Sequence, residues 1–154
     1  MIRQLDVLGN TEVVTFRELG INSVPARIDT GARTSSVWAS KIDEKDGSLR
    51  FTLFDERSKY YTGETIETKN FGHRAISSSN GHVERRYTVE LVINILGRNI
   101  RATFTLANRS SQAYPVLVGR NILRGKFVVD VTRENVLSKG QRRPKRQPLV
   151  GRVE

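Results

Sequence analysis

Short stretches of alternating apolar and polar residues run along most of the chain and are separated by turn residues. The clearest alternation covers residues 87–95, stops at the letters LGRN, and resumes over residues 100–106. A period of two residues places every second side chain on the same face of a strand. This segment is therefore predicted to be a β-hairpin with one buried face.

Weaker patterns of the same kind predict strands at residues 13–16, 24–29, 36–42, 49–54, 65–71 and 126–131. The dipeptide Asn80-Gly81 is the strongest turn signal in the chain and predicts an exposed loop tip at residues 77–81. One short helix is expected in the letters RNILRG, which Gly119 and Gly125 bracket. The chain is thus expected to be all-β with one short helix.

Length and charge predict one domain followed by a basic tail. A chain of 154 residues has the usual size of a single domain, which we assign to residues 1–138. The net charge is +10, and residues 139–154 contribute +5 of it with six bases and one acid. That stretch lacks apolar periodicity, so we expect a disordered tail with weak affinity for polyanions. The simpler interpretation is a solubilising tail without a specific partner. A further hypothesis is that the basic tail and the positive charge of the rest of the chain make this a ribosome- or RNA-associated protein.

Composition also limits the location of the protein. No run of consecutive apolar residues exceeds three, whereas a membrane span needs roughly 20 and a signal peptide an apolar stretch of about 7 or more. We therefore expect no contact with a membrane. The chain has no cysteine, which fits a reducing compartment, and a cytoplasmic location is predicted.

Motifs for cofactors are missing from the sequence. It has no Gly-x-x-x-x-Gly-Lys loop, no Gly-x-Gly-x-x-Gly and no His-Glu-x-x-His. His73 and His82 could gather a metal together with Glu84, but two exposed loop histidines are the simpler interpretation. A nucleophilic serine is not indicated either, because no Gly-x-Ser-x-Gly is present. The sequence therefore predicts neither a cofactor nor a metal.

The letters ARIDTGARTSSV at residues 26–37 combine a strand with candidate chemistry. The alternating strand ends on Asp29, Thr30 and Gly31. One interpretation is a structural Asx turn, in which the carboxylate accepts backbone amides and the glycine supplies a positive φ. The other is a catalytic acid, because Gly31 and Ala32 are small and leave space for a reactant beside Asp29.

A second stretch strengthens the catalytic interpretation. PVLVGRNIL, residues 115–123, places apolar residues and a glycine before a short helix, about 90 residues after the acid. IDTGA and VLVGRN together resemble the retropepsin family of aspartic proteases. With the Ser-Ser-Asn-Gly segment, YPVLVGRNIL and FVVDV, residues 5–138 are similar to RimK-associated retropepsin-like proteins, also called ATP-dependent zinc proteases. The aspartic motif is complete here, whereas the sequence shows no ATP site and no zinc-ligand cluster.

The resemblance implies an acid-protease β-barrel, closed or partly open, whose two aspartates share one proton and activate a water. The sequence has one Asp-Thr-Gly, so the pair requires a homodimer with both Asp29 carboxylates at a twofold interface. Thr30 would form hydrogen bonds across that interface, and the Gly31 amide would help to hold the carboxylates. Gly119 would let the chain pass behind this loop and Arg120 would anchor the helix start, both as structural residues.

The same resemblance implies a set of substrate-binding residues. The tip with Ser79, Asn80 and Gly81 would be a flap that closes over an extended peptide, and an ordinary surface hairpin is an equal alternative. Viral retropepsins carry an acid after Asp-Thr-Gly-Ala, where this chain has Arg33. Ala32 and Arg33 are assigned to substrate binding, and a basic cleft would attract the glutamate tails that the family's partner ligases add. The predicted function is an aspartic endopeptidase, and the alternative is a catalytically silent peptide-binding module of the same fold.

Overall fold

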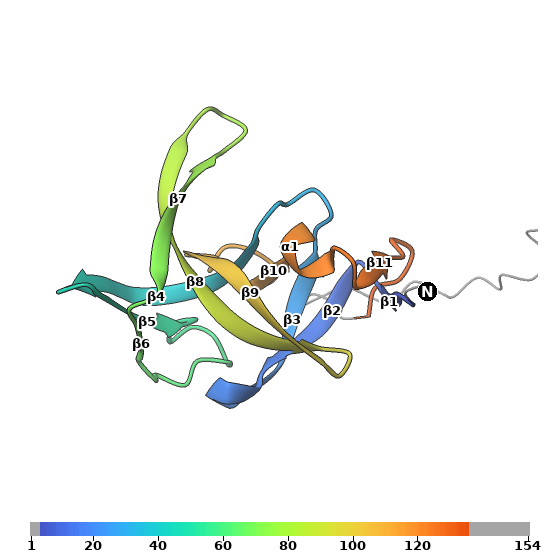
Figure 1. Cartoon of the computed structure of the whole chain (residues 1–154), viewed down its shortest axis with the longest axis horizontal. Helices are drawn as coiled ribbons and strands as arrows, with labels where there is room; N and C mark the ends of the chain where they lie inside the picture. Colours follow the sequence, from blue (N-terminus) through green and yellow to red (C-terminus); the bar gives the residue numbers. More distant parts are fainter. Residues whose placement is uncertain (1–3, 136–154) are drawn as a thin grey trace, which may run out of the picture.

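The computed structural model describes residues 4–135 and confirms an all-β fold in which the described part has one short α-helix (Figure 1). The strands are β1 (Asp6–Leu8), β2 (Thr11–Phe16), β3 (Ile21–Ile28), β4 (Ser35–Lys45), β5 (Ser48–Leu53), β6 (Ile66–Thr68), β7 (Phe71–Ser77), β8 (Val83–Ile95), β9 (Arg98–Ala107), β10 (Val116–Val118) and β11 (Phe127–Val129). A 3-10 turn, η1 (Arg17–Leu19), follows β2, and the helix α1 (Arg120–Leu123) follows β10. The predicted basic tail, residues 139–154, lies outside the described residues.

The main sheet curls into a partly closed ring. Its strand order is β10-β3-β2-β8-β9-β4-β5-β6, and β10 also pairs with β4. The strand β10 therefore joins the two sides of the ring, parallel to β3 and antiparallel to β4. The seam between β2 and β8 is thin, because Thr15 and Asn94 are its one registered pair. A separate parallel pair, β1 and β11, lies beside the ring.

Aromatic and branched side chains fill the inside of the ring. Phe16 and Phe104 are fully buried, and their ring centroids lie 6.2 Å apart. Phe51 and Phe54 are also fully buried at the β5 end of the sheet. Phe16 and Phe104 come from strands with alternating burial, so on β2 and β9 the pattern that predicted the strands also identifies the face that packs the core.

The hairpin predicted at residues 87–106 is confirmed and is longer than expected. The strands β8 and β9 are joined by a two-residue turn at Leu96 and Gly97, whose φ angles are +50° and +82°. Two positive φ angles match the right-handed twist of the strands. The predicted helix is also present, as the four residues of α1.

Three strands were not predicted, and the reason differs among them. The three residues of β10 form a continuous apolar run, which is typical of a strand covered on both faces and shows no alternation. The strand β7 is largely exposed, so burial imposes no pattern on it. The parallel strand β1 has three residues and carries little signal. The single strand expected over 65–71 was wrong, because β6 ends at Thr68 and β7 begins at Phe71.

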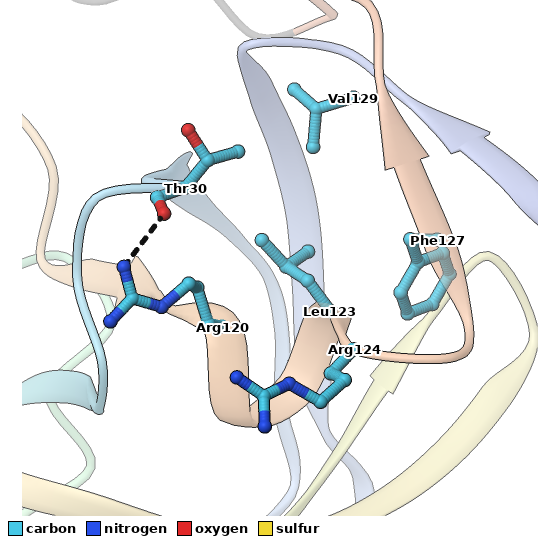
Figure 2. Close-up of a pocket in the computed structure, with 6 residues that line it drawn as sticks. All are labelled: Thr30, Arg120, Leu123, Arg124, Phe127 and Val129. Atoms are coloured by element: carbon cyan, nitrogen blue, oxygen red, sulfur yellow. Dashed lines mark hydrogen bonds between the residues drawn. The ribbon is translucent and has the colours of Figure 1, made fainter.

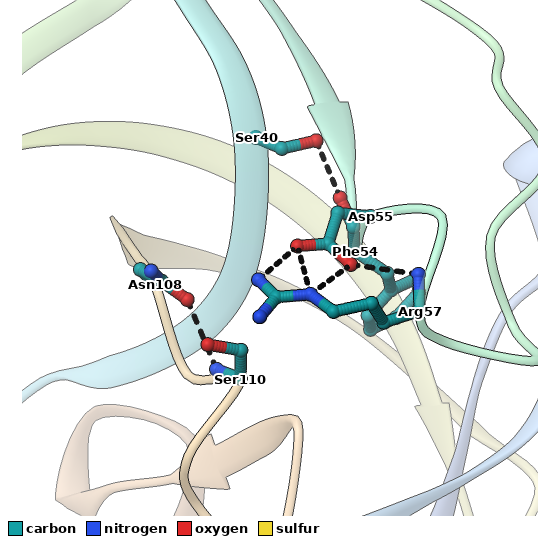
Figure 3. Close-up of polar contacts among 6 residues, drawn as sticks. All are labelled: Ser40, Phe54, Asp55, Arg57, Asn108 and Ser110. Atoms are coloured by element: carbon teal, nitrogen blue, oxygen red, sulfur yellow. Dashed lines mark hydrogen bonds and ion pairs between the residues drawn. The ribbon is translucent and has the colours of Figure 1, made fainter.

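The turn after β5 is held by polar contacts that Figure 3 shows. The Arg57 guanidinium forms an ion pair with Asp55, with 2.6 Å between Nη2 and Oδ2. Ser40 Oγ donates to the Phe54 carbonyl oxygen at 2.6 Å and joins β4 to the end of β5. The hydrogen bond from Arg57 lowers the pKa of the Asp55 carboxyl below its ordinary value.

The Arg57→Gln substitution should raise the pKa of Asp55 toward its ordinary value. Because the pKa of Asp55 is lower in the folded state, the ionised carboxyl stabilises the folded chain at pH values above its unfolded-state pKa. This stabilisation is lost as the pH falls through the folded-state pKa. An NMR titration of the Asp55 carboxyl carbon measures the shift. The variant Arg101→Gln removes an exposed arginine from β9 and should leave the Asp55 titration unchanged; an equal shift in both variants would contradict the assignment to Arg57.

Candidate active site

Asp29 follows the last residue of β3 and is held by the neighbouring strand. Its backbone N–H donates to the carbonyl oxygen of Val118 at 2.9 Å, which continues the parallel pairing of Val118 with Ile28. The sequence predicted Asp29 as the end of the strand, whereas β3 ends one residue earlier. The side chain is half-buried. The acid thus lies where the chain leaves the sheet.

A tight turn follows and binds the Asp29 carboxylate. The Gly31 N–H donates to Asp29 Oδ1 at 2.9 Å, and the Ala32 N–H donates to the Asp29 carbonyl oxygen at 3.2 Å. The Asx-turn interpretation expected a positive φ at Gly31, and this part is wrong, because Gly31 is not among the residues with positive φ. A Cβ at Gly31 would lie 3.2 Å from Asp29 Oδ1, so the glycine serves close approach to the carboxylate.

Gly119 and Arg120 lie beneath this turn. A Cβ on Gly119 would lie 2.8 Å from the Ala32 carbonyl oxygen and 2.9 Å from that of Thr34. The Arg120 N–H donates to the Ala32 carbonyl oxygen at 2.8 Å. The guanidinium of Arg120 donates to the carbonyl oxygens of Thr30 at 3.4 Å and Gly31 at 3.5 Å, and Figure 2 shows the first of these contacts.

The sequence analysis missed a hydrogen-bond network that connects the turn to α1. The fully buried Ser35 hydroxyl accepts from the Gly119 N–H at 2.9 Å and donates to Asn121 Oδ1 at 2.8 Å. The Asn121 amide in turn donates to the Thr103 carbonyl oxygen on β9 at 2.9 Å. Asn121 is the last residue of the motif VLVGRN, so the sequence could have indicated its role. No feature of the sequence indicated the role of Ser35.

Two open pockets flank α1, and they separate Arg33, which was assigned to substrate binding, from Thr30, which was assigned to catalysis. Arg33 lines a pocket of about 360 Å³ together with Arg120, Asn121 and Arg124. Thr30 lines the other, of about 250 Å³, whose remaining walls come from α1 and β11 (Figure 2). Arg33 and Arg120 thus lie at the same pocket, two like charges that cannot pair.

The tip assigned to the flap lies at the end of a projecting hairpin. Figure 1 shows the β7–β8 hairpin extending away from the ring. At its tip, Asn80 Oδ1 accepts from the His82 N–H at 3.3 Å, the Gly81 N–H donates to the Ser78 carbonyl oxygen at 3.0 Å, and Gly81 has a φ of +80°. Ser79 is exposed beside them. Near its base the hairpin reaches the Asp29 turn, where Arg74 hydrogen-bonds to the Thr34 hydroxyl.

Arg109 lies within electrostatic range of Asp29 and of two other arginines, and none of the three arginines was identified from the sequence. They are Arg27 on β3, Arg86 on β8 and Arg109 after β9. Burial lowers the pKa of the Arg109 guanidinium, the charges of Arg86 and Arg27 lower it further, and the Asp29 carboxylate raises it. Arg27 carried a weak signal, because it stands two residues before the acid in an alternating strand.

One histidine occupies a different place from that expected, whereas His82 lies in the exposed turn before β8, as predicted. His73 lies in β7, not in a loop, with its ring centroid 4.5 Å from that of Tyr87. Among residues 4–135, no three histidine, cysteine, aspartate or glutamate side chains gather as a metal site. Within the same residues, no helix has the length and apolar character needed to cross a membrane.

A Gly119→Ala substitution should destabilise the protein by about 1–3 kcal/mol, because the added methyl overlaps backbone atoms of the Asp29 turn. Urea unfolding measures the loss, and NMR amide shifts of residues 29–34 report the displaced turn. Gly47→Ala is a control with a positive φ of +76° and no atom within 4 Å. It should cost about 1–2 kcal/mol and leave those amide shifts in place. Unchanged shifts in Gly119→Ala would contradict the close packing.

Comparisons with known proteins identify the family of this chain. The family model described as retropepsin-like aspartic endopeptidase RimB matches residues 7–140. Proteins named probable alpha-L-glutamate ligase are 35% identical in Shewanella halifaxensis and 28% identical in Desulfotalea psychrophila, each over 128 residues and 80% of this chain. The chain spans 28% of the length of these curated relatives.

A solved structure is similar as well. It is a protein of unknown function from Legionella pneumophila, with a TM-score of 0.64 and 27% identity, and the alignment covers 84% of this chain and 95% of that one. The resemblance noted in IDTGA and VLVGRN is therefore confirmed by the family match over residues 7–140. This chain belongs to the RimB-like family of retropepsin-like aspartic endopeptidases.

Proposed function

We propose that this protein is an aspartic endopeptidase that hydrolyses peptide bonds as a homodimer. The observation that carries the proposal is the Asp29 turn itself. A half-buried carboxylate lies at the end of β3, its Oδ1 accepts the Gly31 N–H, and the strand beside it holds the Asp29 backbone. A carboxylate fixed in this way can take a proton from a bound water without reorganising.

The chemistry requires two such carboxylates. One Asp29 takes a proton from water while the water oxygen bonds to the peptide carbonyl carbon. The partner subunit's Asp29, which carries the shared proton, donates it to the carbonyl oxygen. The tetrahedral intermediate then breaks its C–N bond as the nitrogen takes the proton that the first Asp29 gained from water. One hydroxyl of the intermediate returns its proton to the partner subunit's Asp29, which releases a carboxylic acid and an amine. The two carboxylates would share one proton, because two adjacent negative charges repel each other.

The face around Thr30 supports a twofold dimer. The residue is exposed and lines one pocket with Phe127 and Val129 of β11. Apolar side chains are exposed on the adjoining pair of strands, with Val7 of β1 at 42% and Val128 of β11 at 44%. These exposed apolar side chains belong to the same strand pair as the pocket residues Phe127 and Val129, and they would be covered when two copies meet at this strand pair.

Glutamate-rich protein tails are the proposed substrate. The curated relatives are named probable alpha-L-glutamate ligases, and a protease that shares a domain with them would act on chains containing glutamate. The positive charges near Asp29 and at Arg33 favour acidic peptides. An extended peptide would lie across the Asp29 turn, and the Ser79–Gly81 tip would close over it when the hairpin bends inward.

Replacing the catalytic carboxylate tests the reaction. Asp29→Asn should lower the rate of cleavage of a glutamate-rich peptide by on the order of 10³-fold, because the amide cannot accept the proton from water. Cleavage is measured by mass spectrometry of the products. Asp43→Asn removes an exposed acid from β4 and should keep the wild-type rate. Full activity in Asp29→Asn would exclude the mechanism, and peptide binding without any cleavage by the wild-type protein would support the peptide-binding module instead.

Dimer formation is tested at the exposed strand pair. Val128→Asp should weaken both self-association, measured by sedimentation equilibrium, and cleavage, because it places a charge in the proposed interface. Ile42→Asp is the matched control, since Ile42 is 37% exposed and lies on β4. It should change neither property. A wild-type protein that stays monomeric at high concentration yet cleaves peptide would overturn the two-aspartate site.

A further inference from the structure

Arg109 lies within electrostatic range of Arg27, Arg86 and Asp29, and the three arginines, which come from different segments of the chain, are named the arginine cluster. In β3, Val24, Ala26 and Ile28 point into the core, so Arg27 points outward. Alternation places Asp29 on the same outward face two residues later. Arg27 is exposed, and among residues 4–135 it forms no ion pair.

The topology of the sheet brings the other two arginines to this face. Arg109 follows β9, and its Nε donates to the Tyr114 carbonyl oxygen at 3.0 Å, two residues before β10. The strand β10 pairs Leu117 with Arg27. Arg86 lies on β8, two residues before Thr88, which pairs with Thr105 near the end of β9. The cluster therefore forms where β3, β8 and the β9–β10 connection converge.

The charges of this cluster are incompletely balanced by the protein. Arg86 forms an ion pair with Glu84 at 3.2 Å, and it stands directly opposite another arginine, Arg74, on β7. Like charges opposite each other in a sheet are destabilising. Arg109 is half-buried and, within the described part of the chain, forms no ion pair with a carboxylate. Positive charges that repel one another destabilise the folded protein, so this cluster is a candidate site for an anionic ligand that would balance them.

The geometry of Arg109 favours a carboxylate as that ligand. Its Nε–H is held by the Tyr114 carbonyl oxygen, which orients the planar guanidinium. Among the described residues, no protein oxygen accepts a hydrogen bond from its two Nη groups. A guanidinium with free Nη groups matches the two oxygens of a carboxylate better than a lysine ammonium would.

We propose that the arginine cluster is a specificity subsite that binds a carboxylate of the peptide next to the scissile bond, with Arg109 as its central donor. This inference rests on the proposed function, because it places the peptide across the Asp29 turn. It is a different position from the Arg33 pocket beside α1. A glutamate or aspartate side chain supplies the carboxylate within a chain, and the terminal carboxylate of a peptide is the other source.

The experiment measures binding, so that it does not depend on catalysis. All variants are made in the Asp29→Asn protein, and fluorescence anisotropy measures the Kd of a labelled, C-terminally amidated peptide with a run of glutamates. The same peptide with glutamines in place of the glutamates is the uncharged reference. Arg109→Gln should reduce the preference for glutamate over glutamine by about tenfold or more, while affinity for the glutamine peptide stays within about twofold.

Further variants separate a specific subsite from general charge and from loss of folding. Arg101→Gln removes one exposed charge from β9 and should retain the preference. Arg27→Gln should reduce the preference for glutamate as Arg109→Gln does. Because Arg27 is exposed, this variant tests the subsite without a loss of folding. Arg109→Lys keeps the charge without the planar guanidinium and should recover only part of the preference. Circular dichroism verifies that each variant is folded.

Three results would overturn the subsite. The first is equal affinity of the protein for the glutamate and glutamine peptides. The second is a preference for glutamate that is retained in both Arg109→Gln and Arg27→Gln, and the third is a preference that is lost in Arg33→Gln but not in those two variants. If only peptides with a free C-terminus bind tightly, the carboxylate is the terminal one. Failure of the proposed function would give a different result. The preference for the glutamate peptide in binding would be intact, but the wild-type protein would cleave neither peptide.

Discussion

The three-residue strand β10 joins the two strands on either side of the Asp29 turn, and the geometry of the site depends on this insertion. Val116 pairs with Ala26 of β3 and with Val37 of β4, so the chain that leaves β3 must bend over the end of β10 before it returns. The Asp29 N–H binds the carbonyl oxygen of Val118, which fixes the acid at the start of this bend. Because β10 then continues directly into Gly119, the turn and the helix α1 pack against each other without a gap.

The Asp29 turn is held rigidly, whereas the β7–β8 hairpin projects from the ring. The base of the site consists of backbone hydrogen bonds and the buried Ser35 hydroxyl, which leave the turn little freedom. The β7–β8 hairpin extends from the ring with few buried side chains, and such segments open and close at low cost. Arg74 links the two parts through Thr34. A fixed carboxylate beneath a hairpin that can bend is an arrangement suited to binding an extended peptide.

Much of the fold could be predicted because it follows from local patterns. The β8–β9 hairpin has alternating residues on both strands and a glycine at its turn, so its two strands required no knowledge of the rest of the chain. The strand β10 could not be predicted in the same way, since a short apolar run looks alike in a strand, a helix or a loop. For the same reason Ser35, an ordinary serine in the sequence, acquired its role only when α1 packed beside it.

The sequence by itself determined the motifs, their order and the family, because Asp-Thr-Gly-Ala and Gly-Arg-Asn are recognisable as letters. Only the tertiary structure decided which charged side chains come within electrostatic range of one another near Asp29. Arg86 lies 57 positions after Asp29 and Arg109 lies 80 positions after it, and no local pattern relates residues so far apart. Arg86 and Arg109 come near each other because β8 pairs with β9 in the same curved sheet that contains β10, and the register of that pairing places Arg86 near the end of β9.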